Sequence, residues 1–223
     1  MLDNLYIVDY PDEARFAEAE SMFADYDHEK YVSCPQCGSR VSGSYWVHPR
    51  EAKLTKHNVP DFLYTVSSNT PFLLSERALK EIRQAGMTGL ICAEEIESVS
   101  FQRKSKKSID IPKYYYIELV RSPITIDHKN SQIIYGGSYG GGVKCPLCRQ
   151  IPRTYDFFRG LAFQGNDENI YDMFHIYELG DTVLLSQRFV DFYHQSGLTG
   201  LCFSPAKEYG RESTDFLFGK ENE

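Results

Sequence analysis

The sequence predicts an α+β protein made of two tandem pseudo-symmetric α/β repeats. The first observation is that nine of the twenty residues in 73–92 recur 111 positions later, in 184–203. The same offset superimposes two cysteine pairs, and each half combines strand-like segments with one helix-like segment. A gap-free offset of this kind indicates a duplicated unit. We therefore expect a first repeat over residues 1–110 and a second over 111–223, packed as one globular unit.

Each half is expected to begin with a strand. Residues 5–8 and 114–120 are rich in the aromatic and β-branched side chains that strands favour. Further strand-like segments follow in both halves, at residues 41–47, 62–66, 154–158 and 171–178.

Each half is expected to close with a helix, over residues 75–86 and 186–197. A serine stands where a side-chain oxygen would cap the first free amides, and a glycine stands where a left-handed residue would end the helix. Apolar side chains recur every three or four positions and predict one buried stripe. The residues concerned are Ser75, Gly86, Ala78, Leu79 and Ile82, and then Ser186, Gly197, Phe189, Val190 and Tyr193. The repeated basic residues beside the caps, Arg77 and Arg188, are predicted to link each helix to a sheet.

Four of the six cysteines form two Cys-Pro-x-Cys pairs, Cys34 with Cys37 and Cys145 with Cys148. A turn of this type directs two thiolates at one point, and two such turns supply the tetrahedral sulfur set that structural Zn²⁺ prefers. In a compact zinc ribbon about 15–20 residues separate the pairs, far fewer than here. We therefore expect the two halves to bring these zinc-knuckle turns together, so that one shared structural zinc staples the repeats.

Separate metal sites and a thioredoxin-like redox motif are the alternatives. Separate sites would need further ligands, and no histidine recurs at the offset of 111. A redox motif is expected beside a βαβ unit. Gly38 follows the first pair and suits a positive φ, whereas Arg149 stands at the equivalent position and is expected to cost about 1 kcal/mol of strain. The remaining cysteines, Cys92 and Cys202, lie in apolar runs and are expected to be buried.

The acidic charge is concentrated at the start of the chain. Residues 1–30 carry nine acidic and two basic residues, which equals the net charge of −7 of the whole chain. Such a segment repels phosphate backbones and attracts basic surfaces, so we expect a protein partner and no nucleic acid. Residues 11–30 are expected to form a helix that contacts this partner through Asp12, Glu13, Glu18, Glu20, Asp25 and Asp27. A solvated acidic helix with no partner is the alternative.

The composition and the start of the chain predict a cytoplasmic protein that does not contact a membrane. No apolar run approaches the ~18 residues that a membrane span needs. Residues 1–4 lack the basic and then apolar order of a signal peptide. Six cysteines, four of them in metal-type pairs, suit a reducing compartment.

Catalytic motifs are weak in this sequence. Residues 136–140 match the nucleophile elbow G-x-S-x-G, centred on Ser138. That motif requires a helix after the serine, and the glycine-rich loop 136–142 cannot sustain one. We therefore expect the protein not to be an enzyme, with a serine hydrolase as the remote alternative.

The two cysteine motifs and the two Leu-Ser…Gly-x-Thr-Gly-Leu elements together resemble the bacterial double-CXXCG motif family. The motifs are Cys34-Pro35-Gln36-Cys37-Gly38 and Cys145-Pro146-Leu147-Cys148, and the elements are residues 74–90 and 185–201. The resemblance implies an immunity protein that binds and neutralises a cognate antibacterial toxin by stoichiometric inhibition. Arg149 departs from the pattern, which has glycine there. A zinc-stapled binding or regulatory module with another protein partner is the alternative.

Overall fold

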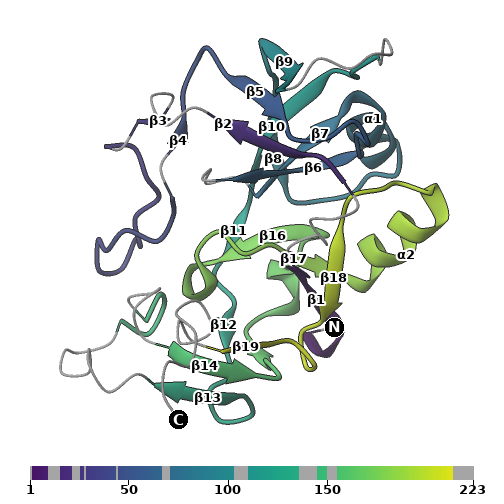
Figure 1. Ribbon diagram of the computed structural model, residues 1–223. Helices are drawn as coiled ribbons and strands as arrows, with labels where there is room; N and C mark the ends of the chain where they lie inside the picture. Colours follow the sequence, from purple (N-terminus) through teal and green to yellow (C-terminus); the bar gives the residue numbers. More distant parts are fainter. Residues whose placement is uncertain are drawn as a thin grey trace, which may run out of the picture.

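The part of the chain that the structure describes is mixed α+β, with mostly strands and two α-helices. The computed structural model describes residues 2–9, 16–21, 26–27, 29–43, 45–66, 71–102, 110–135, 145–149 and 155–212. Two sheets dominate, and in Figure 1 the larger sheet with α1 lies above the smaller sheet with α2. No helix in the described ranges is long and apolar enough to span a membrane.

The larger sheet has seven strands in the order β8-β10-β7-β6-β2-β5-β9. Their bounds, in that order, are Leu90–Glu95, Tyr114–Leu119, Phe72–Ser75, Phe62–Val66, Glu18–Ser21, Glu51–Leu54 and Ser98–Phe101. The edge strands β8 and β9 are consecutive in the chain and are joined by Ile96 and Glu97 alone. The sheet must therefore curve until its two edges approach each other. One hydrophobic cluster joins side chains of this sheet, including the buried Tyr114 and Tyr116, to the buried Trp46 of β4.

The smaller sheet has five strands in the order β11-β16-β17-β1-β18. Their bounds are Arg121–Ser122, Met173–Ile176, Leu184–Ser186, Leu5–Asp9 and Cys202–Pro205. Three minor sheets pair β12 (Thr125–Ile126) with β15 (Phe163–Gln164), β3 (Tyr26–Asp27) with β4 (Tyr45–Trp46), and β14 (Tyr155–Arg159) with both β13 (Gln132–Tyr135) and β19 (Gly210–Glu212). Short 3-10 turns occupy Leu2–Asn4, Asp167–Asn169 and Tyr177–Leu179.

The first strands of the two halves are exchanged between the sheets. β1, at the start of the chain, pairs with β17 and β18 of the second half, with Leu5 opposite Ser186. β10, at the start of the second half, pairs with β7 and β8 of the first half, with Tyr114 opposite Ser75. Each half of the chain therefore completes the sheet that carries the helix of the other half.

The helices form where the caps predict. α1 spans Glu76–Gln84 and α2 spans Gln187–Ser196. The Ser75 and Ser186 hydroxyls each accept a hydrogen bond from the amide three residues later, at 3.1 Å in both helices. Gly86 and Gly197 follow the helices with φ of 62° and 63°. The predicted apolar stripes of both helices are buried in one shared hydrophobic core, which also receives strands from both sheets.

The helix caps are tied across the molecule by a buried aspartate in each half. Asp172 accepts hydrogen bonds from the Ser186 hydroxyl at 2.8 Å and from the Thr88 amide at 2.8 Å. Arg188 forms an ion pair with Asp172 at 2.7 Å and donates to the Ala85 carbonyl at the end of α1. The equivalent contacts, each 111 residues away, join Asp61 to Ser75, Thr199 and Arg77. The two arginines link their helices to other elements, but the carbonyls that they contact belong to the end of the other helix and not to a sheet. The aspartates were not predicted, although Asp61 and Asp172 are related by the same offset.

Two of the predicted elements are wrong in part. Residues 11–30 are not one helix, because Glu18–Ser21 forms β2 and Tyr26–Asp27 forms β3. Buried Ala17 and Ala19 alternate with the more exposed Glu18 and Glu20, which is the period of two that strands require, and this pattern prevails over the helical spacing. The expected strand at 41–47 is reduced to Tyr45–Trp46.

The expectation that Cys92 and Cys202 are buried is also wrong. Cys92 is half-buried and Cys202 is exposed. Both lie on strands at a sheet edge, β8 and β18, which have a neighbour on one side only. The two cysteines are not equivalent under the offset of 111, which places Cys92 on Phe203. Cys92 lies opposite Glu118 and Cys202 lies opposite Asp9.

Candidate metal centre

The four cysteines of the two pairs meet at one point. Their sulfur atoms all lie within 4.8 Å of one another. Cys34 lies 3.8 Å from Cys145 and Cys37 lies 3.5 Å from Cys148, between Sγ atoms. Four sulfurs at the usual Zn–S distance of about 2.3 Å in a tetrahedron are separated by about 3.8 Å. The spacing therefore fits one tetrahedral metal ion, and it is far longer than the ~2.05 Å of a disulfide.

The two cysteine turns have the same backbone geometry. The Gly38 amide donates to the Cys34 carbonyl at 2.9 Å, and the Arg149 amide donates to the Cys145 carbonyl at 2.9 Å. Gly38 has φ of 75° and Arg149 has φ of 52°. A side chain at positive φ costs about 1 kcal/mol relative to glycine, so the second turn keeps the normal geometry at the expected cost in strain.

Arg149 contacts a buried carboxylate. Its Nε lies 3.4 Å from Oε1 of Glu178, a residue with no solvent exposure. The same carboxylate lies 2.7 Å from Nε2 of His128 and accepts a hydrogen bond from the Ile126 amide. The guanidinium therefore balances a charge that would otherwise be costly to bury. This contact was not predicted. The only sign of it in the sequence was the arginine at position 149, where the motif has glycine.

The four thiols differ in exposure. Cys34, Cys145 and Cys148 are buried, with exposed fractions of 1%, 5% and 0%, and Cys37 faces solvent. Burial raises the pKa of Cys34, whereas hydrogen bonds from Ser39 lower the pKa of Cys37 to about 6. Valine, leucine and tyrosine side chains pack around the buried thiols, namely Val32, Val41, Leu147 and Tyr177. Four thiolates complete a tetrahedral site and leave no coordination position for a reacting water.

Histidine does not complete a second metal site in the described part of the chain. Among the described residues, the four cysteines are the only set of at least three Cys, His, Asp or Glu side chains that lie close enough together to bind one ion. His175 faces the Thr182 carbonyl at 3.1 Å, and His48 contacts Glu94 and Glu97. These contacts favour the shared site over two separate Cys-His sites.

Of the six acidic residues predicted to bind a partner, the three that the structure describes lie on two different sheets. Asp12, Glu13 and Asp25 lie outside the described residues, as do Ser138 and the loop 136–142. Glu18 and Glu20 lie on β2, where the exposed Glu20 accepts a hydrogen bond from Gln102. Asp27 lies on β3 of a different sheet and accepts hydrogen bonds from the Glu29 and Lys30 amides. These backbone hydrogen bonds lower the pKa of Asp27, whose role in the structure is to hold a turn.

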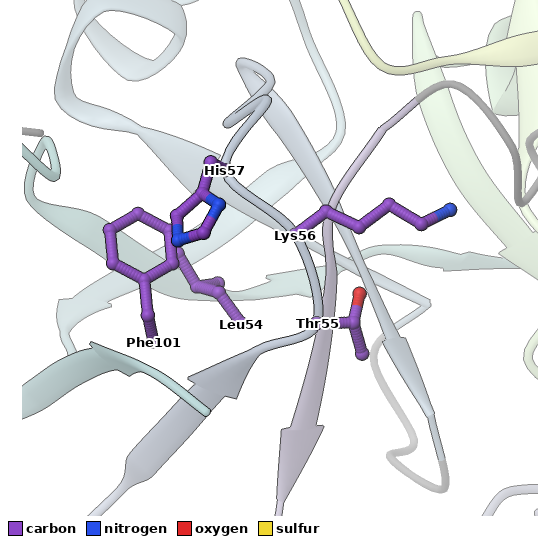
Figure 2. Close-up of a pocket in the computed structure, with 5 residues that line it drawn as sticks. All are labelled: Leu54, Thr55, Lys56, His57 and Phe101. Carbon is purple, nitrogen blue, oxygen red and sulfur yellow. The ribbon is translucent and has the colours of Figure 1, made fainter. Parts of the chain in front are cut away.

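A shallow cavity of about 230 Å³ lies away from the cysteines, at the ends of β5 and β9. Figure 2 shows the ring of His57 beside that of Phe101, with Lys56 pointing away from both. The ring centroids are 4.6 Å apart. The other lining residues are Leu54 and Thr55, and the Thr55 hydroxyl already accepts a hydrogen bond from the Glu18 amide. The lining contains no carboxylate or thiol that could act with the histidine.

No protein-family model matches the chain, and no curated protein sequence matches it either. The functional conclusion therefore rests on the cysteine centre and on the motifs.

Proposed function

We propose that Cys34, Cys37, Cys145 and Cys148 hold one structural Zn²⁺ that staples two pseudo-symmetric repeats. The observation that carries the proposal is the meeting of four sulfurs, two from each half, at tetrahedral spacing. Zinc is the usual ion for a set of four thiolates. The reciprocal aspartate contacts and the exchanged first strands agree with a duplicated unit that closes on itself.

Metal analysis of the purified protein tests this proposal. We expect one zinc per chain, and we expect Cys34→Ser to lower the stability of both halves together. The matched control is Cys202→Ser, which removes an exposed thiol on an edge strand. A folded protein free of metal, or one with two ions per chain, would contradict the shared site.

We further propose that the protein is an immunity protein that binds a cognate antibacterial toxin in the cytoplasm and blocks it without chemistry. Support comes from the resemblance to the double-CXXCG family and from the closed character of a four-thiolate centre, which favours a structural role. The acidic start of the chain suits a toxin with a basic surface, since complementary charge speeds association. A zinc-stapled binding module with another protein partner is the alternative.

Protection of a sensitive cell tests the immunity proposal. The toxin encoded beside the gene is expressed with this protein, and then with a variant in which Glu13, Glu18 and Glu20 become lysine. We expect the wild type to protect and the variant to associate more slowly, with a strong salt dependence. Zinc content should stay nearly unchanged, because none of the three residues is one of the proposed metal ligands, and reversal of the exposed Glu20 should change thermal stability little. If the wild type gives no protection, the immunity proposal fails and the binding module remains.

A further inference from the structure

We propose that the cysteine centre is also an oxidation site, at which a hydroperoxide converts Cys37 and Cys148 into a disulfide between the two halves. This inference rests on the proposed metal site, and it adds a chemical modification to it. In the product, a disulfide joins the two halves in place of the metal ion.

Exposure selects the thiol that reacts first. Cys37 faces solvent, whereas its three neighbours in the centre are at most 5% exposed. The residues before and after it, Gln36 and Gly38, are exposed as well. A small peroxide therefore reaches Cys37 without any opening of the fold. Susceptibility of cysteine to oxidation follows exposure and thiolate character, and a metal-bound cysteine is a thiolate.

Cys148 is the partner that joins the two halves. Its sulfur lies 3.5 Å from the Cys37 sulfur, within direct contact distance. Forming a disulfide of about 2.05 Å requires the two sulfurs to approach by about 1.5 Å. Each turn is held by its own backbone hydrogen bond, from Gly38 to Cys34 and from Arg149 to Cys145. A disulfide across the halves needs a small rigid shift of one turn towards the other and leaves both hydrogen bonds in place.

The reaction balances with one hydroperoxide. With hydrogen peroxide as the hydroperoxide, the Cys37 thiolate attacks one peroxide oxygen, so that an S–O bond forms, the O–O bond breaks, and the other oxygen leaves as hydroxide, which takes a proton from solvent to become water. The Cys148 thiolate then attacks the Cys37 sulfur, forming the S–S bond and expelling the second oxygen as hydroxide, which also becomes water. Two electrons pass from the sulfurs to the peroxide. Cys34 and Cys145 remain as thiolates, and two ligands do not hold a structural zinc that needs four.

Peroxide treatment of the full-length protein tests the inference. Metal content is measured before oxidant is added, so that failure of the metal site is recognised independently. Hydrogen peroxide is then added, metal release is followed with a metallochromic dye, and disulfides are mapped on peptides under non-reducing conditions. We expect loss of one metal ion per chain and a fall in free thiols from six to four. The linked peptides should contain Cys37 and Cys148, and dithiothreitol should reverse both changes.

The variant Cys202→Ser is the matched control, because Cys202 is an exposed thiol outside the centre. It should behave as the wild type in metal release and in the linked peptide. A protein that contains no metal beforehand but still gives the Cys37–Cys148 peptide would refute the zinc proposal and support the oxidation site. A Cys34–Cys37 link within one turn, or oxidation confined to Cys202 with the metal retained, would overturn the inference.

Discussion

Replacing Gly200 by alanine should destabilise the protein strongly, because this glycine lies where the two halves touch. Its φ is 103°, and a Cβ there would lie 2.2 Å from the Phe62 carbonyl oxygen and 2.7 Å from the Pro60 Cβ. Both neighbours belong to the other half of the chain. The preceding residue, Thr199, accepts a hydrogen bond from the Phe62 amide at 2.9 Å. The methyl group must therefore push the strand β6 away from this contact.

The cost has three parts. A side chain at this backbone conformation costs about 1 kcal/mol or more, overpacking costs about 1–3 kcal/mol, and a strained or lost backbone hydrogen bond costs about 1 kcal/mol. Together these give a loss of about 3–5 kcal/mol in the free energy of unfolding. Gly197→Ala is the matched control, because Gly197 has φ of 63° and a Cβ there would have no atom within 4 Å. It should cost only the backbone strain, about 1–2 kcal/mol.

Urea denaturation followed by fluorescence measures both losses. Trp46 is the only tryptophan in the chain and is 1% exposed, so its emission reports unfolding of the core. For a chain of this size each kcal/mol corresponds to a fall in Tm of about 2–4 °C. Gly200→Ala should therefore lie well below Gly197→Ala in Tm. Equal losses for the two variants would show that the halves do not approach each other this closely, and the packing argument would fail.

Three further outcomes are expected. Ser75→Ala should lower the free energy of unfolding by about 1–2 kcal/mol, because the Ser75 hydroxyl caps α1 and donates a hydrogen bond to Asp61. Thermal unfolding measures this loss, with Ser98→Ala at an exposed position as the control. Burial and then the charge of Arg121 lower the pKa of His175 to about 3 in the folded protein. Below pH 6.5, the ordinary pKa of about 6.5 lets the unfolded chain bind a proton at this histidine that the folded protein does not bind. The contribution of neutral His175 to the free energy of unfolding is therefore complete above about pH 6.5 and is lost as the pH falls towards 3. Between pH 6.5 and 5 the wild type should lose about 2 kcal/mol more than His175→Gln, and parallel urea midpoints across that range would contradict this. Removal of metal by a strong chelator should lower the Tm of the wild type but not that of Cys34→Ser, and a chelator effect of equal size in both would show that the metal acts elsewhere.

Short-range features of the sequence predicted much of this structure. The serine caps, the closing glycines and the apolar stripes predicted both helices, because these interactions join residues only a few positions apart. The cysteine set could be predicted because its members recur at one offset, and the expected meeting of the two pairs is confirmed by the sulfur distances. The strand at Glu18–Ser21 was missed although its period of two was visible, because the acidic composition and a few apolar spacings suggested a helix.

Only the tertiary structure decided how the halves engage each other. Pairing of β1 with β17 and β18 joins residues nearly 200 positions apart, and no local pattern distinguishes that pairing from one within the first half. Asp61 and Asp172 recur at the offset of 111, but the recurrence does not show which donors they bind. Nothing in the sequence distinguishes Glu178, which is buried against Arg149, from the other acidic residues. Residue types and spacings determine local structure and the candidate ligands, because both depend on neighbours in the chain. Burial, strand order and charge pairing depend on neighbours in space, which the fold alone supplies.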